Sequence, residues 1–216
     1  MPSQTSKKMF KTILSASALS LALLSGAASG ATVAGGNGGF EQQAFDGTFE
    51  TLYSGDISLT GWSIDVGSID LINTYWAPSE GSYSVDMNGF YSAGTISTLV
   101  TGLTAGLDYV LSFDLAANPD SGPEQKNLNV VLGDNLVDET VTSLQSLALD
   151  WTTYTFRFTA SSDTEALSFA SVGDPNGAWG PALDNVTVAS VPLPAGGLLL
   201  IGALGGIAAL RRRKAV

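Results

Sequence analysis

The sequence predicts an all-β fold, with one antiparallel β-sandwich or jelly roll as its domain. Between residues 33 and 190, short segments of alternating apolar and polar residues are separated by Gly, Asn, Asp and Pro, which is typical of strands and turns. No stretch of this region sustains the 3.6-residue apolar period of a helix. Residues 32–190 have the size of one ordinary domain, because both ends of the 216-residue chain read as targeting segments.

Eight or nine strands are expected, which suits a sandwich or jelly roll. The first alternation runs through Trp62, Ile64 and Val66, stops at Gly67 and resumes over 69–71, so a turn or bulge is predicted at Gly67. The other candidate strands cover residues 82–87, 95–101, 109–116, 128–133, 151–160, 166–172 and 183–190.

The predicted domain is strongly acidic. All 20 Asp and Glu residues lie within 32–190, together with only two basic residues, Lys126 and Arg157, so the domain has a net charge of −18. Nucleic acid is excluded as a partner, because phosphate binding needs clustered Lys and Arg. The negative charge is compatible with divalent cations as partners. The alternative explanation is that the acidic residues only keep the surface solvated and the protein soluble.

The chain contains no Cys and no His, which excludes disulfides, Cys/His zinc sites and Ser-His-Asp triads. It has no G-x-S-x-G, H-E-x-x-H, Walker or dinucleotide-binding motif. Glycoside hydrolysis needs two carboxylates, and some pair can always be chosen among 20 acidic residues. The presence of such a pair therefore does not distinguish a glycoside hydrolase from a protein without catalytic activity. We therefore predict a protein that is not an enzyme, with a glycoside hydrolase as the alternative.

Residues 1–31 have the three-part layout of a secretory signal peptide. Three Lys residues precede an apolar run over 13–24, and small residues follow as far as Ala31. The apolar run is too short to cross a hydrocarbon core of about 30 Å as a helix. The sequence therefore predicts export of the protein, with cleavage after Ala28 or Ala31.

Residues 191–216 combine a short Pro-containing motif, an uncharged run and a basic cluster, as in a stop-transfer signal. The motif and the cluster consist of Val191, Pro192, Leu193, Pro194, Ala195, Arg211, Arg212 and Arg213. This arrangement resembles a VPLPA-type PEP-CTERM sorting signal. The resemblance implies a transmembrane segment over 195–210, an inner-membrane intermediate, and cleavage by an exosortase that delivers the protein to the cell surface or extracellular matrix. A plain membrane anchor is the alternative.

A series of short motifs runs through the predicted domain. They are NGGFE at 37–41, GWSI at 61–64, SIDLI at 68–72, EGSYSVDMNG at 80–89, YVLSFDLAANP at 109–119 and GPALDNVTV at 180–188. In this order they resemble the bacterial choice-of-anchor C family, and they are similar to the plant cell-wall domain of unknown function 642. The resemblance implies a galactose-binding-like jelly roll and no assigned reaction.

Three aromatic residues, Tyr75, Trp76 and Trp179, lie in Gly-, Pro- and Asn-rich stretches outside the alternating segments. Sugar rings stack on exposed aromatic faces while polar groups bond their hydroxyls, so these residues are candidates for carbohydrate binding. The alternative is that the tryptophans plug the ends of the sandwich. The polar companions supplied by the family-like motifs are Asp86, Asn118 and Lys126.

The resemblance to carbohydrate-binding jelly rolls also implies a structural Ca²⁺ between the first and last strands. Its candidate ligands are Asn37 and Glu41 from the opening motif and Asp184 from the closing one. Oxygen ligands suit this cation, and Gly38 and Gly39 allow carbonyls to turn inward. The alternative is that the carboxylates are ordinary edge residues.

Together these features predict an exported, non-catalytic surface or matrix protein that recognises extracellular polysaccharide. Two other functions remain open. One is a secreted hydrolase that acts on glycans, and the other is a structural matrix component without a ligand.

Overall fold

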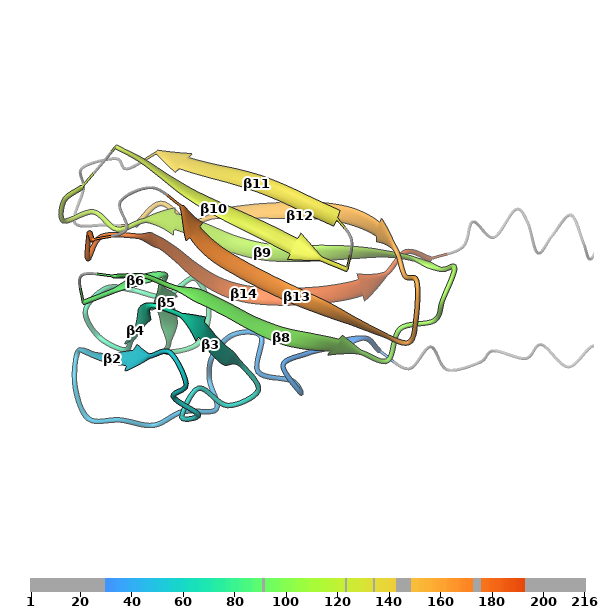
Figure 1. Ribbon diagram of the computed structural model, residues 1–216, viewed down its shortest axis with the longest axis horizontal. Helices are drawn as coiled ribbons and strands as arrows, with labels where there is room; N and C mark the ends of the chain where they lie inside the picture. The colour runs from blue at the N-terminus through green and yellow to red at the C-terminus, as the bar shows by residue number, and fades with distance from the viewer. Residues whose placement is uncertain are drawn as a thin grey trace, which may run out of the picture.

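The computed structural model describes residues 30–90, 92–122, 124–133, 135–142, 149–172 and 176–192. These residues form two antiparallel sheets that pack face to face, with a two-stranded ribbon beside them (Figure 1). None of them lies in an α-helix, so this part of the chain has no helix that is long and apolar enough to span a membrane. The predicted all-β sandwich is confirmed. The predicted segment 195–210 and nearly all of residues 1–31 lie outside the described residues.

Each large sheet contains six strands. Sheet A has the order β1-β8-β13-β10-β11, and β3 also pairs with β8. Its strands are β1 (Thr32–Val33), β3 (Ser63–Val66), β8 (Thr95–Thr101), β10 (Gln125–Leu132), β11 (Asn135–Thr142) and β13 (Thr164–Val172). Sheet B has the order β12-β9-β14-β5-β4-β2. Its strands are β2 (Phe49–Tyr53), β4 (Ser68–Ile72), β5 (Ser84–Asp86), β9 (Asp108–Ala117), β12 (Thr152–Thr159) and β14 (Pro181–Ser190), and the ribbon pairs β6 (Asn88–Gly89) with β7 (Ser92–Ala93).

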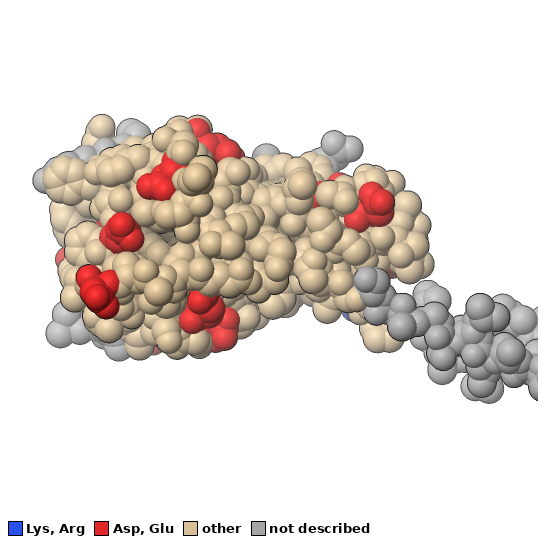
Figure 2. All heavy atoms as spheres, turned by 90° about the horizontal axis from the view of Figure 1, so that it is seen from below, with Lys and Arg blue, Asp and Glu red and all other residues tan. Residues whose placement is uncertain are grey.

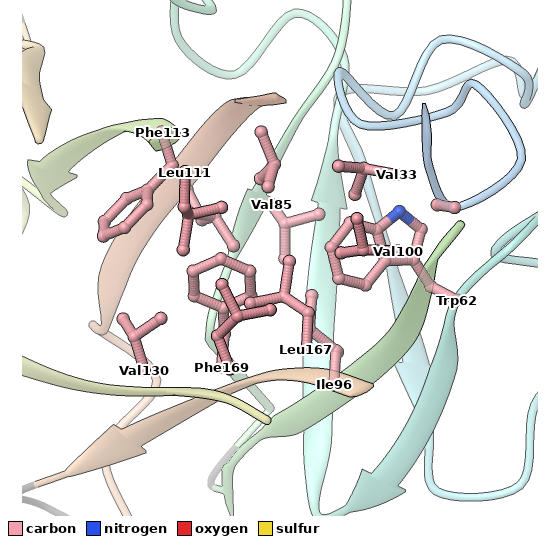
Figure 3. Close-up of a cluster of buried hydrophobic side chains, with 14 of the residues drawn as sticks. Val33, Trp62, Val85, Ile96, Val100, Leu111, Phe113, Val130, Leu167 and Phe169 are labelled. Atoms are coloured by element: carbon pink, nitrogen blue, oxygen red, sulfur yellow. The ribbon is translucent and has the colours of Figure 1, made fainter. Parts of the chain in front are cut away.

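The hydrophobic core lies between the inner faces of the two sheets (Figure 3). Sheet B contributes Leu111 and Phe113, which alternate along β9 and are at most 1 % exposed. Sheet A contributes Phe169 of β13, whose ring meets that of Phe113 edge-on at a centroid distance of 5.2 Å. Trp62 extends this cluster, and its Nε1 donates a hydrogen bond to the Asn37 carbonyl at 2.9 Å. Burial of this apolar surface stabilises the sandwich by roughly 25 cal/mol per Å².

The strands agree with the alternation in most places. Residues 95–101 form β8 with the predicted bounds, and Gly67 separates β3 from β4. A side chain at Gly67 would be strained, because its φ is +64° and a Cβ would lie 2.0 Å from the Ala93 carbonyl oxygen. The alternation did not reveal β2 and β11. In β2, an edge strand, only Leu52 is buried, so the strand has no alternating pattern.

Part of the outer face of sheet B is buried as well. Asp70 stands opposite Asp86 on the neighbouring strand, Asp86 opposite Ala182, and Ala182 opposite Ala116. Residues that are paired directly across neighbouring strands lie on the same face of a sheet. The opposite face of sheet B packs into the core, so these four residues lie on its outer face. All are at most 9 % exposed. Trp76 from the loop after β4 packs in one cluster with the two alanines.

Candidate functional site

Five of the six residues predicted to contact sugar line one pocket on the outer face of sheet B. The pocket has a volume of about 140 Å³ and lies where the loops after β4 and β9 meet the loop before β14. The predicted residues in its lining are Tyr75, Trp76, Asp86, Asn118 and Trp179. The other lining residues are Phe49, Asp70, Ile72, Phe90, Asp120 and Ala178.

Four aromatic side chains of the lining are exposed. Tyr75 is 48 % exposed, Trp179 39 %, Phe49 46 % and Phe90 60 %. The Tyr75 ring contacts the Phe49 ring edge-on, with a centroid distance of 5.7 Å. Four exposed rings around one pocket make this surface a candidate binding site.

Trp76 has a different place from the other predicted aromatic residues. It is only 7 % exposed, and its Nε1 donates a hydrogen bond to the Ser84 hydroxyl at 2.9 Å. Its ring contacts that of Tyr75 at a centroid distance of 5.6 Å. Trp76 therefore builds a wall of the pocket and supports Tyr75, as the plugging alternative predicted for loop tryptophans.

Asp86 lies at the base of the pocket and is 1 % exposed. Its carboxylate accepts hydrogen bonds from Asn118 Nδ2 at 2.7 Å, from the Asn88 amide at 2.9 Å and from the Gly180 amide at 3.0 Å. Burial raises the pKa of Asp86 to about 7, although these hydrogen bonds act in the opposite direction. Gly180 is required for this close approach, because a Cβ there would lie 2.6 Å from Asp86 Oδ1.

Asp70 and Asp120 bring two further carboxylates to the pocket. Asp70 accepts a hydrogen bond from the Thr51 hydroxyl at 2.6 Å, and burial raises its pKa. Asp120 is exposed and accepts the Tyr75 hydroxyl at 2.5 Å. Its backbone amide donates to Asn118 Oδ1 at 2.9 Å, so Asn118 links this loop to the buried Asp86.

Lys126 does not line this pocket. It is 3 % exposed and borders a second, smaller pocket that is also lined by Trp179. Its Nζ donates a hydrogen bond to the Ser121 carbonyl at 2.7 Å. Lys126 therefore supports the loop that follows β9.

Sequence reasoning missed Asp70, Asp120, Phe49 and Phe90. One signal was present for Asp70, which is a charged residue between Ile69 and Leu71 in an alternating segment. No pattern distinguished the other three, because they lie in or next to loops.

Two of the three residues predicted to bind calcium, Asp184 and Glu41, hold the segment 79–83, which follows the loop carrying Tyr75 and Trp76. Asp184 is fully buried and accepts the amide hydrogens of Ser79 at 2.8 Å and Glu80 at 3.1 Å. Burial raises the pKa of Asp184 to about 7. Asp114, directly opposite Asp184 on β9, accepts the Ser79 hydroxyl.

Glu41 holds the other end of the same segment. Its Oε1 accepts the amide hydrogens of Ser82 at 2.8 Å and Tyr83 at 2.9 Å. A side chain at Gly81 would be strained, because its φ is +60° and its Cβ would lie 2.2 Å from Glu41 Oε1, which would have to move. We call Asp184, Asp114 and Glu41 the carboxylate clamp.

Asn37 lies apart from these carboxylates in its hydrogen bonding. Its Nδ2 donates to the Thr60 carbonyl at 2.7 Å, and its Oδ1 accepts the Gln42 amide at 2.9 Å. Within the described ranges, no group of three or more acidic side chains is arranged to hold a metal ion. Glu41 Oε1 and both oxygens of Asp184 accept backbone amide hydrogens in this structure. Calcium binding remains a prediction.

Most of the predicted sorting signal lies outside the described residues. Val191 and Pro192 are described, and the Val191 amide donates to the Asp108 carbonyl at 2.9 Å, beside the start of β9. Residues 193–195 and 211–213 are not described.

The fold and the pocket together define an antiparallel β-sandwich with an aromatic, acidic pocket on one outer face. The chain belongs to the family described as Protein of unknown function (DUF642), whose model matches residues 36–189. This confirms the resemblance to that family. Membership of the choice-of-anchor C family remains a prediction.

One curated relative is halomucin of Haloquadratum walsbyi, which is 32 % identical over 221 residues. The match covers 92 % of this chain but only 2 % of halomucin, so the chain spans a small part of that protein's length.

Three solved structures share parts of the fold at low sequence identity. TmCBM61 in complex with β-1,4-galactotriose has a TM-score of 0.47 and 18 % identity, covering 72 % of this chain and 96 % of that one. A family 35 carbohydrate binding module from Clostridium thermocellum has a TM-score of 0.45 and 18 % identity, covering 66 % and 99 %. The α-L-arabinofuranosidase MgGH51 has a TM-score of 0.49 and 12 % identity, covering 78 % and 28 %.

Proposed function

We propose that the domain binds carbohydrate in the pocket on the outer face of sheet B, without catalysing a reaction. The observation that carries this proposal is the set of exposed aromatic rings placed beside carboxylate and amide groups around one pocket. Sugar-binding sites need both, because pyranose rings stack on aromatic faces while their hydroxyls form hydrogen bonds.

Two of the lining carboxylates, Asp70 and Asp120, have acceptor capacity for sugar hydroxyls. Among the described residues, the Asp70 side chain accepts only the Thr51 hydroxyl, and the Asp120 side chain accepts only the Tyr75 hydroxyl. Each carboxylate has two oxygens and about four acceptor positions. Hydroxyl groups of a bound sugar can therefore donate to both.

The size of the pocket favours a small part of a glycan. Its volume of about 140 Å³ is below the roughly 300–1,000 Å³ of pockets that enclose drug-sized ligands. We infer that one sugar ring enters and that the rest of the glycan remains outside.

One observation favours the alternative of glycoside hydrolysis. Asp70 and Asp86 are cross-strand partners, and the pKa of about 7 for Asp86 is suitable for a general acid. Against this, both Asp86 oxygens already accept N–H groups and the side chain is 1 % exposed, so it offers no oxygen to a leaving group. Binding is therefore the function that the geometry supports best.

The test is a glycan array followed by titration calorimetry of the full-length protein with each bound oligosaccharide. Tyr75→Ala and Trp179→Ala should each weaken binding by about tenfold, because they remove stacking surface. Tyr53→Ala is the matched control, since Tyr53 is 55 % exposed on the same sheet but does not line the pocket. Release of shorter products would support a hydrolase, and the absence of any binding would support a structural component without a ligand.

We further propose that the protein is exported and reaches the cell surface or extracellular matrix through its C-terminal segment. An exosortase-type protease would be its partner, and the inner membrane its intermediate location. The order of motif, uncharged run and Arg cluster supports this. Replacement of residues 191–195 by a neutral spacer should leave the protein in the inner membrane, as measured by cell fractionation. Normal amounts at the surface would contradict the proposal.

A further inference from the structure

The lining of the pocket contains acidic side chains and no basic one. Asp70, Asp86 and Asp120 line it, whereas Lys126 and Arg157, the two basic residues of the described ranges, do not. Figure 2 shows further groups of Asp and Glu side chains on the surface of the domain. An anionic ligand therefore meets like charge on approach and again inside the pocket.

The titration of the lining residues reflects this negative field. The hydrogen bond from Tyr75 to Asp120 raises the pKa of the Tyr75 hydroxyl, and the charges of Asp120 and Asp86 add to the effect. The charge of Asp70 likewise contributes to the raised pKa of Asp86, after burial. A positive charge in this pocket would therefore be stabilised by several groups together.

The exposed aromatic rings also favour a positively charged ligand. A cation over the face of Trp, Tyr or Phe is attracted by the electron-rich ring, more strongly where water is excluded. Tyr75, Trp179, Phe49 and Phe90 supply such rings around the carboxylates. An ammonium group can thus combine contact with a ring and a charge-assisted hydrogen bond to a carboxylate.

We propose that the pocket selects a sugar unit bearing a protonated amine, such as an unacetylated hexosamine, over its neutral counterpart, and rejects uronic acids. The inference rests on the proposed function and assigns the ammonium group to Asp70 and Asp120. Asp86 is not assigned, because N–H groups of the protein occupy both of its oxygens.

The test is titration calorimetry of the full-length protein at low ionic strength with two sets of sugars. The first set consists of β-1,4-linked trisaccharides of glucose, N-acetylglucosamine and glucosamine, which share one backbone and differ at C2. The second set consists of galactose, galactosamine and galacturonic acid. The amine should bind about tenfold tighter than its hydroxyl counterpart, and the uronate at least about tenfold more weakly. Added salt should reduce the amine's advantage.

Asp120→Asn and Asp70→Asn should each reduce the preference for the amine to about threefold or less. Both sugars lose a carboxylate acceptor in these variants, but only the amine loses the charge that holds it. Asp120 is exposed, so its variant tests the charge without disturbing the core. Asp163→Asn is the matched control, because this exposed residue lies in the turn between β12 and β13, at the end of the sandwich away from the start of β14 (Figure 1).

Two results would overturn the inference and leave the proposed function intact. One is equal affinity for the amine and neutral sugars, and the other is a preference for the amine that both Asp variants retain. Absence of binding to any sugar, whatever its charge, would instead overturn the proposed function itself.

Discussion

The outer faces of the two sheets differ in what covers them. On sheet A, Leu99 of β8 is 55 % exposed, and its cross-strand partner Ala166 is exposed too. On sheet B, Asp86, Ala182 and Asp184 are at most 1 % exposed. The two faces belong to the same sandwich, yet among the described residues only the second has another layer of chain above it.

That layer is the segment between β4 and β5. It buries Trp76 against the sheet, and the carboxylate clamp fixes residues 79–83 through their amide hydrogens. Aspartates that would face water on a bare sheet are thereby buried, and two of them, Asp184 and Asp114, accept hydrogen bonds from Ser79 of the covering segment. The comparison teaches that buried acidic residues on an outer face indicate where the sandwich has gained a third layer and, in this protein, a pocket.

Substitutions on the outer faces of the two sheets should differ most in their effect on the free energy of unfolding. Asp86→Ala leaves the Asn88 and Gly180 amides and the Asn118 side chain without their acceptor, so the free energy of unfolding should fall by about 3 kcal/mol. Ser97→Ala on the outer face of sheet A should change it by less than about 0.5 kcal/mol. Urea denaturation of the full-length variants measures both. Equal losses would contradict the third-layer interpretation.

The buried aspartates on the covered face of sheet B should also make the stability of the protein depend on pH. The pKa values of Asp86 and Asp184 are raised from 3.8 to about 7, so between these values the folded state binds more protons than the unfolded state. Stability should therefore fall as pH rises from about 4 to about 7, and level off above. The lowered pKa values of Asp56 and Glu165 act in the opposite direction, below about pH 4.5.

Urea midpoints measured from pH 4 to pH 8 test this dependence. Asp86→Asn should flatten the slope, whereas the exposed Asp163→Asn should leave it unchanged. A midpoint that rises across the window would show that the buried aspartates are not the titrating groups.

The calcium prediction concerns Glu41 and Asp184 on the covered side of the molecule. A cation that binds only the folded state at a hundredfold excess over Kd adds about 2.7 kcal/mol, or roughly 5–11 °C in Tm. Magnesium should do less, because it retains its waters. Thermal melts with calcium, magnesium and chelator measure the effect, and Glu41→Gln and Asp184→Asn should remove it. If calcium gives no selective rise, the carboxylate clamp alone accounts for the two residues.

The smallest effect is expected at the exposed end of the carboxylate clamp. Glu41→Gln weakens the two hydrogen bonds from Ser82 and Tyr83, so stability should fall by about 1 kcal/mol. Sugar affinity should fall as well, because the loop that carries Tyr75 loses one of its attachments. Glu50→Gln on the exposed edge of β2 is the matched control. Unchanged sugar affinity in Glu41→Gln would show that the loop is held without the Glu41 carboxylate.

Much of the fold could be predicted because residues facing the core alternate with residues facing water. This holds for β8 and for β12, where the partly buried Tyr154 and Phe156 and the buried Phe158 share a face. It fails for β4 and β5, whose residues are buried on both faces, so their bounds and depth could not be predicted. A bare sandwich was expected, and the third layer was not.

The site was predicted by residue type more than by pattern. Tyr75 and Trp179 were selected as aromatic residues in loop-like stretches, and Asn118 came from the family-like motifs. Turns at one end of a sandwich meet in space, and all three residues line the pocket. Lys126 of β10 lies at a smaller pocket that Trp179 also borders, and not in the lining with the other five residues. For Glu41 and Asp184, sequence could indicate proximity of the first and last segments but not whether amide hydrogens or a cation would occupy their oxygens.

The positions of the chain ends give the sandwich a direction. β9 runs from Asp108, next to Val191, to Ala117, next to Pro181 at the pocket end. Ten strand residues at about 3.3 Å each separate these ends by roughly 30 Å. A molecule tethered to a surface through Val191 would therefore hold the pocket at the end of the sandwich away from that surface, where a polymer too large to reach the tether could still touch it.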